Sequence, residues 1–156
     1  TDHFCADFDA HYGQQVQQLM DQYQRLRAFP ENRSVLWQLK HQGIPIGILS
    51  NGDAAMLTAA INSVSFNHLF DHVISVDSIR KYKTHPDAYA LGEQALQMAA
   101  KDILFVSCNA WDALGATWHG YQTLWVNRYH LPFEELGTQP TRIGADLTAV
   151  LDFFPD

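Results

Sequence analysis

The chain has 156 residues, of which 47% are hydrophobic and 17% charged, and its net charge at pH 7 is -7. This length suits one domain with a substantial core, and no segment approaches the roughly 18 uncharged apolar residues of a membrane-spanning helix. Ten basic residues against seventeen acidic ones, without a basic stripe, argue against nucleic acid as a partner. Two cysteines and no signal-peptide pattern favour a reducing cytoplasm.

The spacing of apolar residues predicts alternating helices and strands. Intervals of three and four residues indicate helices, and short continuous apolar runs between turn residues indicate buried strands. Glycine ends helices in the left-handed conformation, and proline suits their first position. In the first half of the chain we expect helical residues 2–28 with a break at Gly13, a helix through Val35 and Leu39 ended by Gly43, a strand at 44–49, a helix capped by Asp53 and a strand at 73–76. In the second half we expect a helix from Pro86 to about Ala99, a strand at 103–106, a helix near 111–118 ended by Gly120, a strand at 123–126 and a short helix at 146–154.

This order predicts an α/β fold with one parallel sheet covered by helices on both faces. In such sheets small molecules bind beyond the carboxyl ends of the strands. Polar residues follow the predicted strands at Ser50-Asn51 and at 107–112, and Lys83 precedes a helix at the same edge. We therefore expect a functional site where these three segments meet.

Each of these residues also has a simpler interpretation. A Ser-Asn-Gly after a strand is usually only a turn, and a lone loop lysine is usually solvated. Asn109 and Asp112 could merely cap a helix, which is worth roughly 0.5 to 2 kcal/mol. Tyr89 and Trp111 could belong to the core. Their joint occurrence at strand ends favours one common site.

Four segments together resemble the L-2-haloacid dehalogenases of the haloacid dehalogenase (HAD-like) hydrolase superfamily. They are residues 48–52, 82–89, 105–112 and 125–128, and Ser-x-Asn-Ala-Trp-Asp at 107–112 is the most specific of them. Their order and spacing match the family's second, third and fourth motifs over nearly the whole chain. The resemblance implies a Rossmannoid parallel sheet flanked by helices.

The resemblance also implies a role for each polar residue at the strand ends. Ser50 would bind the substrate carboxylate, Asn51 would hold the departing halide, and Lys83 would pair with the nucleophilic carboxylate. Asn109 and Asp112 would orient Lys83 and the hydrolytic water. Tyr89 and Ser107 would line the site, and Trp111 would form a wall of the pocket. Such a reaction needs a cation beside the nucleophile and donors for the leaving halide.

The family's first motif, a strand ending in Asp-x-Tyr-Gly-Thr, has no convincing counterpart in this sequence. Asp9 lies in a similar string, but the residues before it are too polar for a buried strand, and too few residues separate it from Ser50. We therefore expect residues 1–28 to be the remnant of a helical cap and residues 29–156 to be a core that lacks its first, central strand. The strands at 44–49 and 103–106 would then flank a gap, unless they pair directly.

The implied function is hydrolysis of short L-2-haloalkanoic acids to 2-hydroxy acids through an aspartyl ester, without metal or cofactor. The nucleophile would lie outside this chain, so we expect the isolated chain to be inactive. One alternative is an inactive remnant or interaction module. Another is a metal-dependent phosphatase of the same superfamily, which Ser107-Cys108 in the place of its Gly-Asp argues against. A homodimer and a missing N-terminal segment both remain open as partners.

Overall fold

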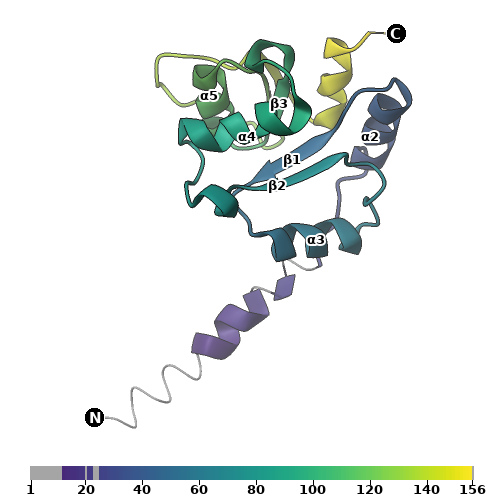
Figure 1. Cartoon of the computed structure of the whole chain (residues 1–156), viewed down its shortest axis with the longest axis vertical. Coiled ribbons are helices and arrows are strands. Elements are labelled where there is room, and N and C mark those ends of the chain that lie inside the picture. The colour runs from purple at the N-terminus through teal and green to yellow at the C-terminus, as the bar shows by residue number, and fades with distance from the viewer. Residues whose placement is uncertain (1–11, 20, 23–24, 156) are drawn as a thin grey trace.

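The computed structural model describes residues 12–19, 21–22 and 25–155 (Figure 1). Residues 12–19 are helical, and Gly13 lies within this helix, so the predicted break at Gly13 is wrong. The elements that follow are α2 (Asn32–His41), β1 (Gly47–Ser50), α3 (Ala54–Ser63), β2 (His72–Ser75), the 3-10 helix η1 (Val76–Ile79), α4 (Pro86–Leu96), the 3-10 helix η2 (Ala100–Asp102), β3 (Leu104–Ser107), α5 (Ala110–His119), β4 (Gln122–Val126), β5 (Arg142–Gly144) and the 3-10 helix η3 (Leu147–Phe153).

The strands form two parallel sheets, as expected if a gap separates the strands that would flank the central one. One sheet pairs β1 with β2, in a register that runs from Gly47 opposite His72 to Ser50 opposite Ser75. The other has the order β3-β4-β5. Among the described residues β1 bonds only to β2, and β3 bonds only to β4. The alternative of direct pairing between β1 and β3 is therefore not what this structure contains.

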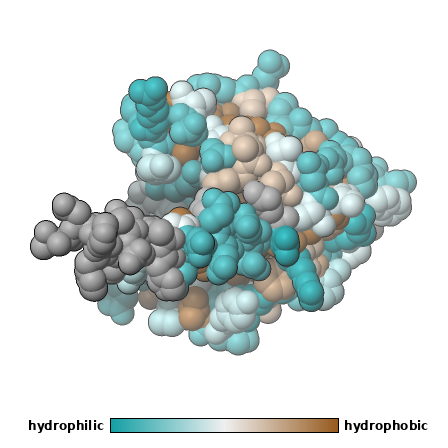
Figure 2. Space-filling view, turned by 90° about the horizontal axis from the view of Figure 1, so that it is seen from below, coloured by the Kyte–Doolittle hydropathy of each residue, from teal (hydrophilic) through white to brown (hydrophobic). Residues whose placement is uncertain are grey.

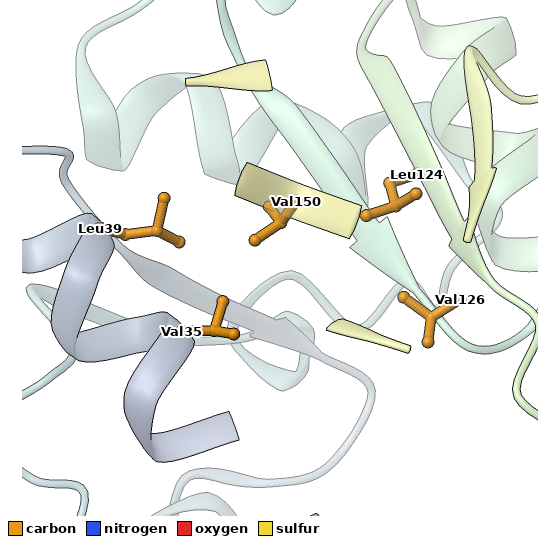
Figure 3. Close-up of a cluster of buried hydrophobic side chains, with 5 residues drawn as sticks. All are labelled: Val35, Leu39, Leu124, Val126 and Val150. Carbon is orange, nitrogen blue, oxygen red and sulfur yellow. The ribbon is translucent and has the colours of Figure 1, made fainter. Parts of the chain in front are cut away.

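The described residues form three buried hydrophobic clusters, two of which bear on how the sheets are joined. The helical spacing of Val35 and Leu39 turns both side chains toward β4 and η3, where they meet Leu124, Val126 and Val150 (Figure 3). In a second cluster, Tyr89 and Tyr121 pack against Leu49 of β1 and Phe105 of β3. This second cluster connects the β1-β2 sheet to the β3-β4-β5 sheet, although the two sheets are not hydrogen-bonded to each other.

Local signals end and begin the helices largely as the sequence predicts. Gly43 and Gly120 take positive φ angles of 76° and 108° just after α2 and α5. The Asp53 carboxylate accepts a hydrogen bond from Met56 N at 2.8 Å and caps α3. Pro86 is the first residue of α4, which ends at Leu96 rather than near Ala99 because the next residue is left-handed.

Three further expectations differ from the structure. The first predicted strand begins at Gly47 instead of Ile44, and it is only partly buried because β1 is an open edge. The short strand β5 was not predicted, since Arg142–Gly144 is too short and too polar to stand out. The closing helix expected at 146–154 is the 3-10 helix η3.

One face of the described chain is largely polar. Figure 2 shows hydrophilic residues over most of the face seen from below, with hydrophobic residues between them. None of the helices in the described residues combines the length and the apolar character that crossing a bilayer requires.

Candidate active site

The predicted site residues gather at the carboxyl ends of β1 and β3, as the strand order suggested. Ser50 ends β1 and Ser107 ends β3, while Lys83 lies in the segment before α4. Asn109 is the residue before α5, and Trp111 and Asp112 lie in its first turn. Parallel strands bring these segments to one edge, although they are up to 62 residues apart in sequence (50 to 112).

The centre of the site is a buried ion pair. Lys83 Nζ lies 2.8 Å from Asp112 Oδ2, and the two side chains are 9% and 5% exposed. Lys83 Nζ also donates to the backbone oxygen of Leu49 at 3.1 Å, and it lies 5.2 Å from the centre of the Phe105 ring. A buried charge is tolerated only when it is paired and hydrogen-bonded, and this ammonium meets both conditions.

Both oxygens of the Asp112 carboxylate are occupied. Oδ2 accepts from Lys83 and from Ser107 Oγ, the latter at 3.0 Å, and Oδ1 accepts from the Tyr89 hydroxyl at 2.9 Å. Asp112 also lies in the first turn of α5, where the helix dipole favours a negative charge. The carboxylate is thus held in one orientation, with its charge directed at Lys83.

Tyr89 lies behind this pair and is completely buried. Burial, and next the negative charge of Asp112, raise the pKa of the Tyr89 phenol well above its ordinary value. The phenol therefore stays protonated and donates to Asp112. Its predicted place in the wall of the site remains a prediction, since in this structure the hydroxyl points to Asp112.

Asn51 connects the end of β1 to the lysine segment. Its Oδ1 accepts a hydrogen bond from the backbone nitrogen of Lys83 at 2.9 Å. Ser50 Oγ accepts from Gly52 N at 3.1 Å, which closes the turn after β1. The turn interpretation and the site interpretation therefore apply together at this segment.

Asn109 and Trp111 lie at the open side of the site. The Asn109 side chain makes no capping hydrogen bond to α5, and Ser107 Oγ instead accepts from Asn109 N at 3.2 Å. Trp111 is 40% exposed. Asp112 bonds to Lys83 rather than to the helix end, so simple helix capping does not account for this cluster.

Two cavities adjoin these residues. One, of about 550 Å³, lies between the open edges of β1 and β3 and is lined mainly by their apolar side chains, with Lys83, Ser107 and Asp112 at its polar end. We call it the inter-sheet cavity. The other, of about 590 Å³, is bordered by Ser50 and Asn51 and has an apolar wall from α3.

Sequence reasoning missed two aromatic contributors. Phe105 lies under the Lys83 ammonium, and the hydroxyl of Tyr121 donates to the backbone oxygen of Tyr89. Phe105 is two residues before Ser107, so the alternation of a strand already placed both on one face. Tyr121 gave no comparable signal.

The buried Lys-Asp pair lies where parallel α/β sheets bind small molecules, and comparison with known proteins gives the class of protein. The model of the haloacid dehalogenase-like hydrolases matches residues 2–120. The chain therefore belongs to the haloacid dehalogenase-like hydrolase family.

Within that family the chain is similar to the L-2-haloacid dehalogenases, also called (S)-2-haloacid dehalogenases. It is 46% identical over 122 residues to haloacetate dehalogenase H-2 of Moraxella sp. (strain B), and these aligned residues are 78% of this chain and 54% of that relative. It is 42% identical over 136 residues to the (S)-2-haloacid dehalogenase of Pseudomonas sp. (strain YL), with 87% and 59% covered. The chain thus spans little more than half of these relatives.

Solved structures agree with this placement. A crystal structure of an L-2-haloacid dehalogenase matches with a TM-score of 0.85 and 52% identity, over 87% of this chain and 60% of that one. The L-2-haloacid dehalogenase of Xanthobacter autotrophicus matches with a TM-score of 0.80 and 29% identity, over 86% and 64%.

Proposed function

We propose that the whole protein hydrolyses short L-2-haloalkanoic acids to 2-hydroxy acids. The observation that carries this proposal is the buried Lys83-Asp112 pair at the polar end of the inter-sheet cavity. The names of the similar proteins give the substrate class. Residues 1–28 would belong to a helical cap over the core of residues 29–156. Cytoplasmic location and a homodimer remain predictions.

The nucleophile would be an Asp carboxylate outside the described residues, on an extended segment in the inter-sheet cavity. Both walls of that cavity offer an open parallel strand edge, and its apolar lining suits a strand buried on both faces. Lys83 Nζ has three N–H groups, and two of them bond to Leu49 O and Asp112. The third would hold the incoming carboxylate ionised and oriented.

In the first step, a carboxylate oxygen of the nucleophile would bond to C2 of the substrate while the halide leaves with the carbon-halogen electron pair. Ser50 would bind the substrate carboxylate, Asn51 would receive the halide, and Trp111 would border the pocket. In the second step, water would attack the carbonyl carbon of the ester, oriented by the region of Asn109, Ser107 and Asp112. The bond between the carbonyl carbon and the alcohol oxygen breaks, that oxygen takes one proton of the water, the other proton goes to solvent, and the Asp carboxylate is regenerated. The configuration at C2 is inverted.

A metal-dependent phosphatase is disfavoured by the partners of Asp112. Lys83, Ser107 and Tyr89 already occupy both oxygens, and a hard cation such as Mg²⁺ would have to displace the ammonium. The residues that the structure describes include no group of three side chains suited to a metal ion.

The test is chloride release from L-2-chloropropionate by the full-length protein and by the 156-residue chain. The full-length protein should act on the L form and give 2-hydroxypropionate of opposite configuration, at a rate that EDTA does not change. The 156-residue chain alone should be inactive. Phosphate release from p-nitrophenyl phosphate that requires Mg²⁺ would instead favour the phosphatase. Activity of neither kind in the full-length protein would favour an inert module.

The first variant to examine is Lys83→Met in the full-length protein. It removes the cation that orients the nucleophile and leaves Asp112 as an uncompensated buried charge, so turnover should fall at least about a thousandfold and stability by about 3 to 5 kcal/mol. The matched control is Lys81→Met, because Lys81 is 45% exposed and pairs only with the exposed Asp87. Its rates should match the wild type, with a stability change below about 1 kcal/mol. Equal effects of the two variants would contradict the role of Lys83.

A further inference from the structure

Tyr89 is held at both its backbone and its hydroxyl group. Its hydroxyl donates to Asp112 Oδ1 at 2.9 Å, and the Tyr121 hydroxyl donates to its backbone oxygen. The rings of Tyr89 and Phe105 pack edge to face, with their centroids 5.5 Å apart. The centroid of the His119 ring lies 5.7 Å from that of the Tyr89 ring. Because the ring is fully buried among these groups, its hydroxyl has little freedom to withdraw.

The space for this hydroxyl exists because residue 115 is a glycine. Gly115 lies on α5, three residues after Asp112 and therefore on the same side of the helix. A Cβ at this position would lie 2.5 Å from the Tyr89 hydroxyl oxygen and 2.7 Å from Thr84 Cγ2. Both distances are below the 3.0 Å that real Cβ atoms respect, so a side chain here must displace a neighbour.

We propose that Gly115 is a positioning residue for the reaction: its lack of a side chain lets the Tyr89 hydroxyl reach Asp112 and so orients the carboxylate that holds Lys83. This inference rests on the proposed function and adds to it a residue that contacts neither substrate nor nucleophile. An alanine would push the Tyr89 hydroxyl away from Oδ1, while Lys83 and Ser107 stay on Oδ2. The carboxylate would then turn, and the ammonium would follow it.

The intrinsic effect of alanine on the helix has the opposite sign. Within a helix, replacing glycine by alanine normally stabilises by about 0.5 to 1 kcal/mol. A loss at Gly115 therefore reports the contact with its neighbours rather than helix propensity. Gly13 provides the matched control, because it is also helical and a Cβ there would meet no atom of the described residues within 4 Å.

The kinetic test compares Gly115→Ala, Gly13→Ala and the wild type in the full-length protein. Because Gly115→Ala disrupts a hydrogen bond to a charged group, its kcat should fall about tenfold to a hundredfold. Its KM should change less than about twofold. Gly13→Ala should retain wild-type kcat. Wild-type kcat in Gly115→Ala would overturn the proposal.

Rescue separates positioning from general destabilisation. In a background that carries Tyr89→Phe and Thr84→Ser, the hydroxyl and the Thr84 methyl group that the alanine would meet are both gone, so Gly115→Ala should lower kcat no more than about threefold there. Gly92 offers a second comparison, since a Cβ on Gly92 would lie 2.7 Å from the Tyr121 hydroxyl. Gly92→Ala should be rescued by Tyr121→Phe and not by Tyr89→Phe. Full additivity of Gly115→Ala with Tyr89→Phe and Thr84→Ser would contradict the inference.

A spectroscopic readout tests the inference without any dehalogenation. The ¹³C resonance of the Asp112 carboxyl group, measured on the 156-residue chain, should shift in Gly115→Ala and stay in place in Gly13→Ala. If the wild-type full-length protein releases no halide, the proposed function is wrong. The resonance still tests whether Gly115 positions the Asp112 carboxylate. An unchanged resonance in Gly115→Ala would overturn the positioning role.

Discussion

At the residue scale, Asp112 accounts for most of the order in the site. A carboxylate that is 3% exposed would be costly alone, and here hydrogen bonds from Lys83, Ser107 and Tyr89 compensate it. The donors come from the segment before α4, from β3 and from α4 itself. One side chain of α5 therefore connects the end of β3 with the stretch that runs from Lys83 into α4.

Tyr121 gives a prediction at alkaline pH. Burial, and next the charge of Glu93, raise the pKa of Tyr121 to about 12 from its ordinary value of 10.0. Below pH 10 the phenol is protonated in both states and its contribution is complete. Between pH 10 and 12 the unfolded state loses its proton first, so the free energy of unfolding should fall by up to about 3 kcal/mol from this group.

Tyr121→Phe should show the reverse pattern in denaturant unfolding at a series of pH values. Near pH 7 it should be less stable than the wild type by about 1 to 2 kcal/mol, because Tyr89 O loses its donor. From pH 10 to 12 its stability should decline less steeply than that of the wild type. If stability declined with pH equally steeply in the variant and the wild type, the pKa of Tyr121 would not differ between the folded and the unfolded state.

At the element scale, the start of β1 is connected to α2 by a surface carboxylate. Asp71 accepts a hydrogen bond from Ile46 N at 2.9 Å and pairs with Lys40 at the end of α2. The Lys40 hydrogen bond, and next that of Ile46 N, hold the pKa of Asp71 below its ordinary value. Asp71 thus joins the helix to the sheet on the outside, while Leu36 of α2 and Ile48 of β1 pack against one hydrophobic cluster inside.

Asp71→Asn should lower the free energy of unfolding at pH 7 by about 0.5 to 1 kcal/mol, a modest value because the pair is partly exposed to solvent. A carboxyl group with a depressed folded-state pKa stabilises above its unfolded value, near 3.8, and the effect is lost as the pH falls through the folded value. The difference between variant and wild type should therefore vanish in acid. Asp152→Asn is the control, since Asp152 pairs with Arg142 and its side chain is 61% exposed. A constant difference down to pH 2 would contradict the electrostatic origin.

At the scale of the whole molecule, the two sheets present open edges to each other across the inter-sheet cavity. Figure 1 shows β1 and β2 side by side between α3 and the unit of α4, β3 and α5. An open parallel edge carries unpaired backbone groups, which proteins usually cover. The proposed segment that carries the nucleophile would cover both edges at once.

Hydrogen exchange tests this arrangement. In the 156-residue chain, amides on the open edges of β1 and β3 should exchange quickly, while amides bonded between β3 and β4 stay protected. In the full-length protein the same edge amides should exchange at least about tenfold more slowly. Equal exchange in both proteins would mean that no strand covers these edges.

Much of the local structure could be predicted because short-range chemistry controls it. Gly43 and Gly120 end helices through their positive φ angles, Asp53 caps α3, and Pro86 opens α4. The polar clusters at the strand ends were also recognisable, because parallel strands bring their carboxyl ends to one edge. The strand β5 was not, because it forms only by pairing with β4, and the end of α4 was not, because a glutamine gives little sign that it will be left-handed.

The sequence by itself determined the alternation of helices and strands, the family and the residues that meet at the strand ends. Only the tertiary structure decided which atoms face each other: the Tyr89 hydroxyl bonds to Asp112, Gly115 leaves room for that bond, and the strands divide into two sheets. The reason is that helix ends and apolar runs follow from neighbours a few residues away. Packing and sheet pairing, by contrast, depend on all the surfaces that fold together.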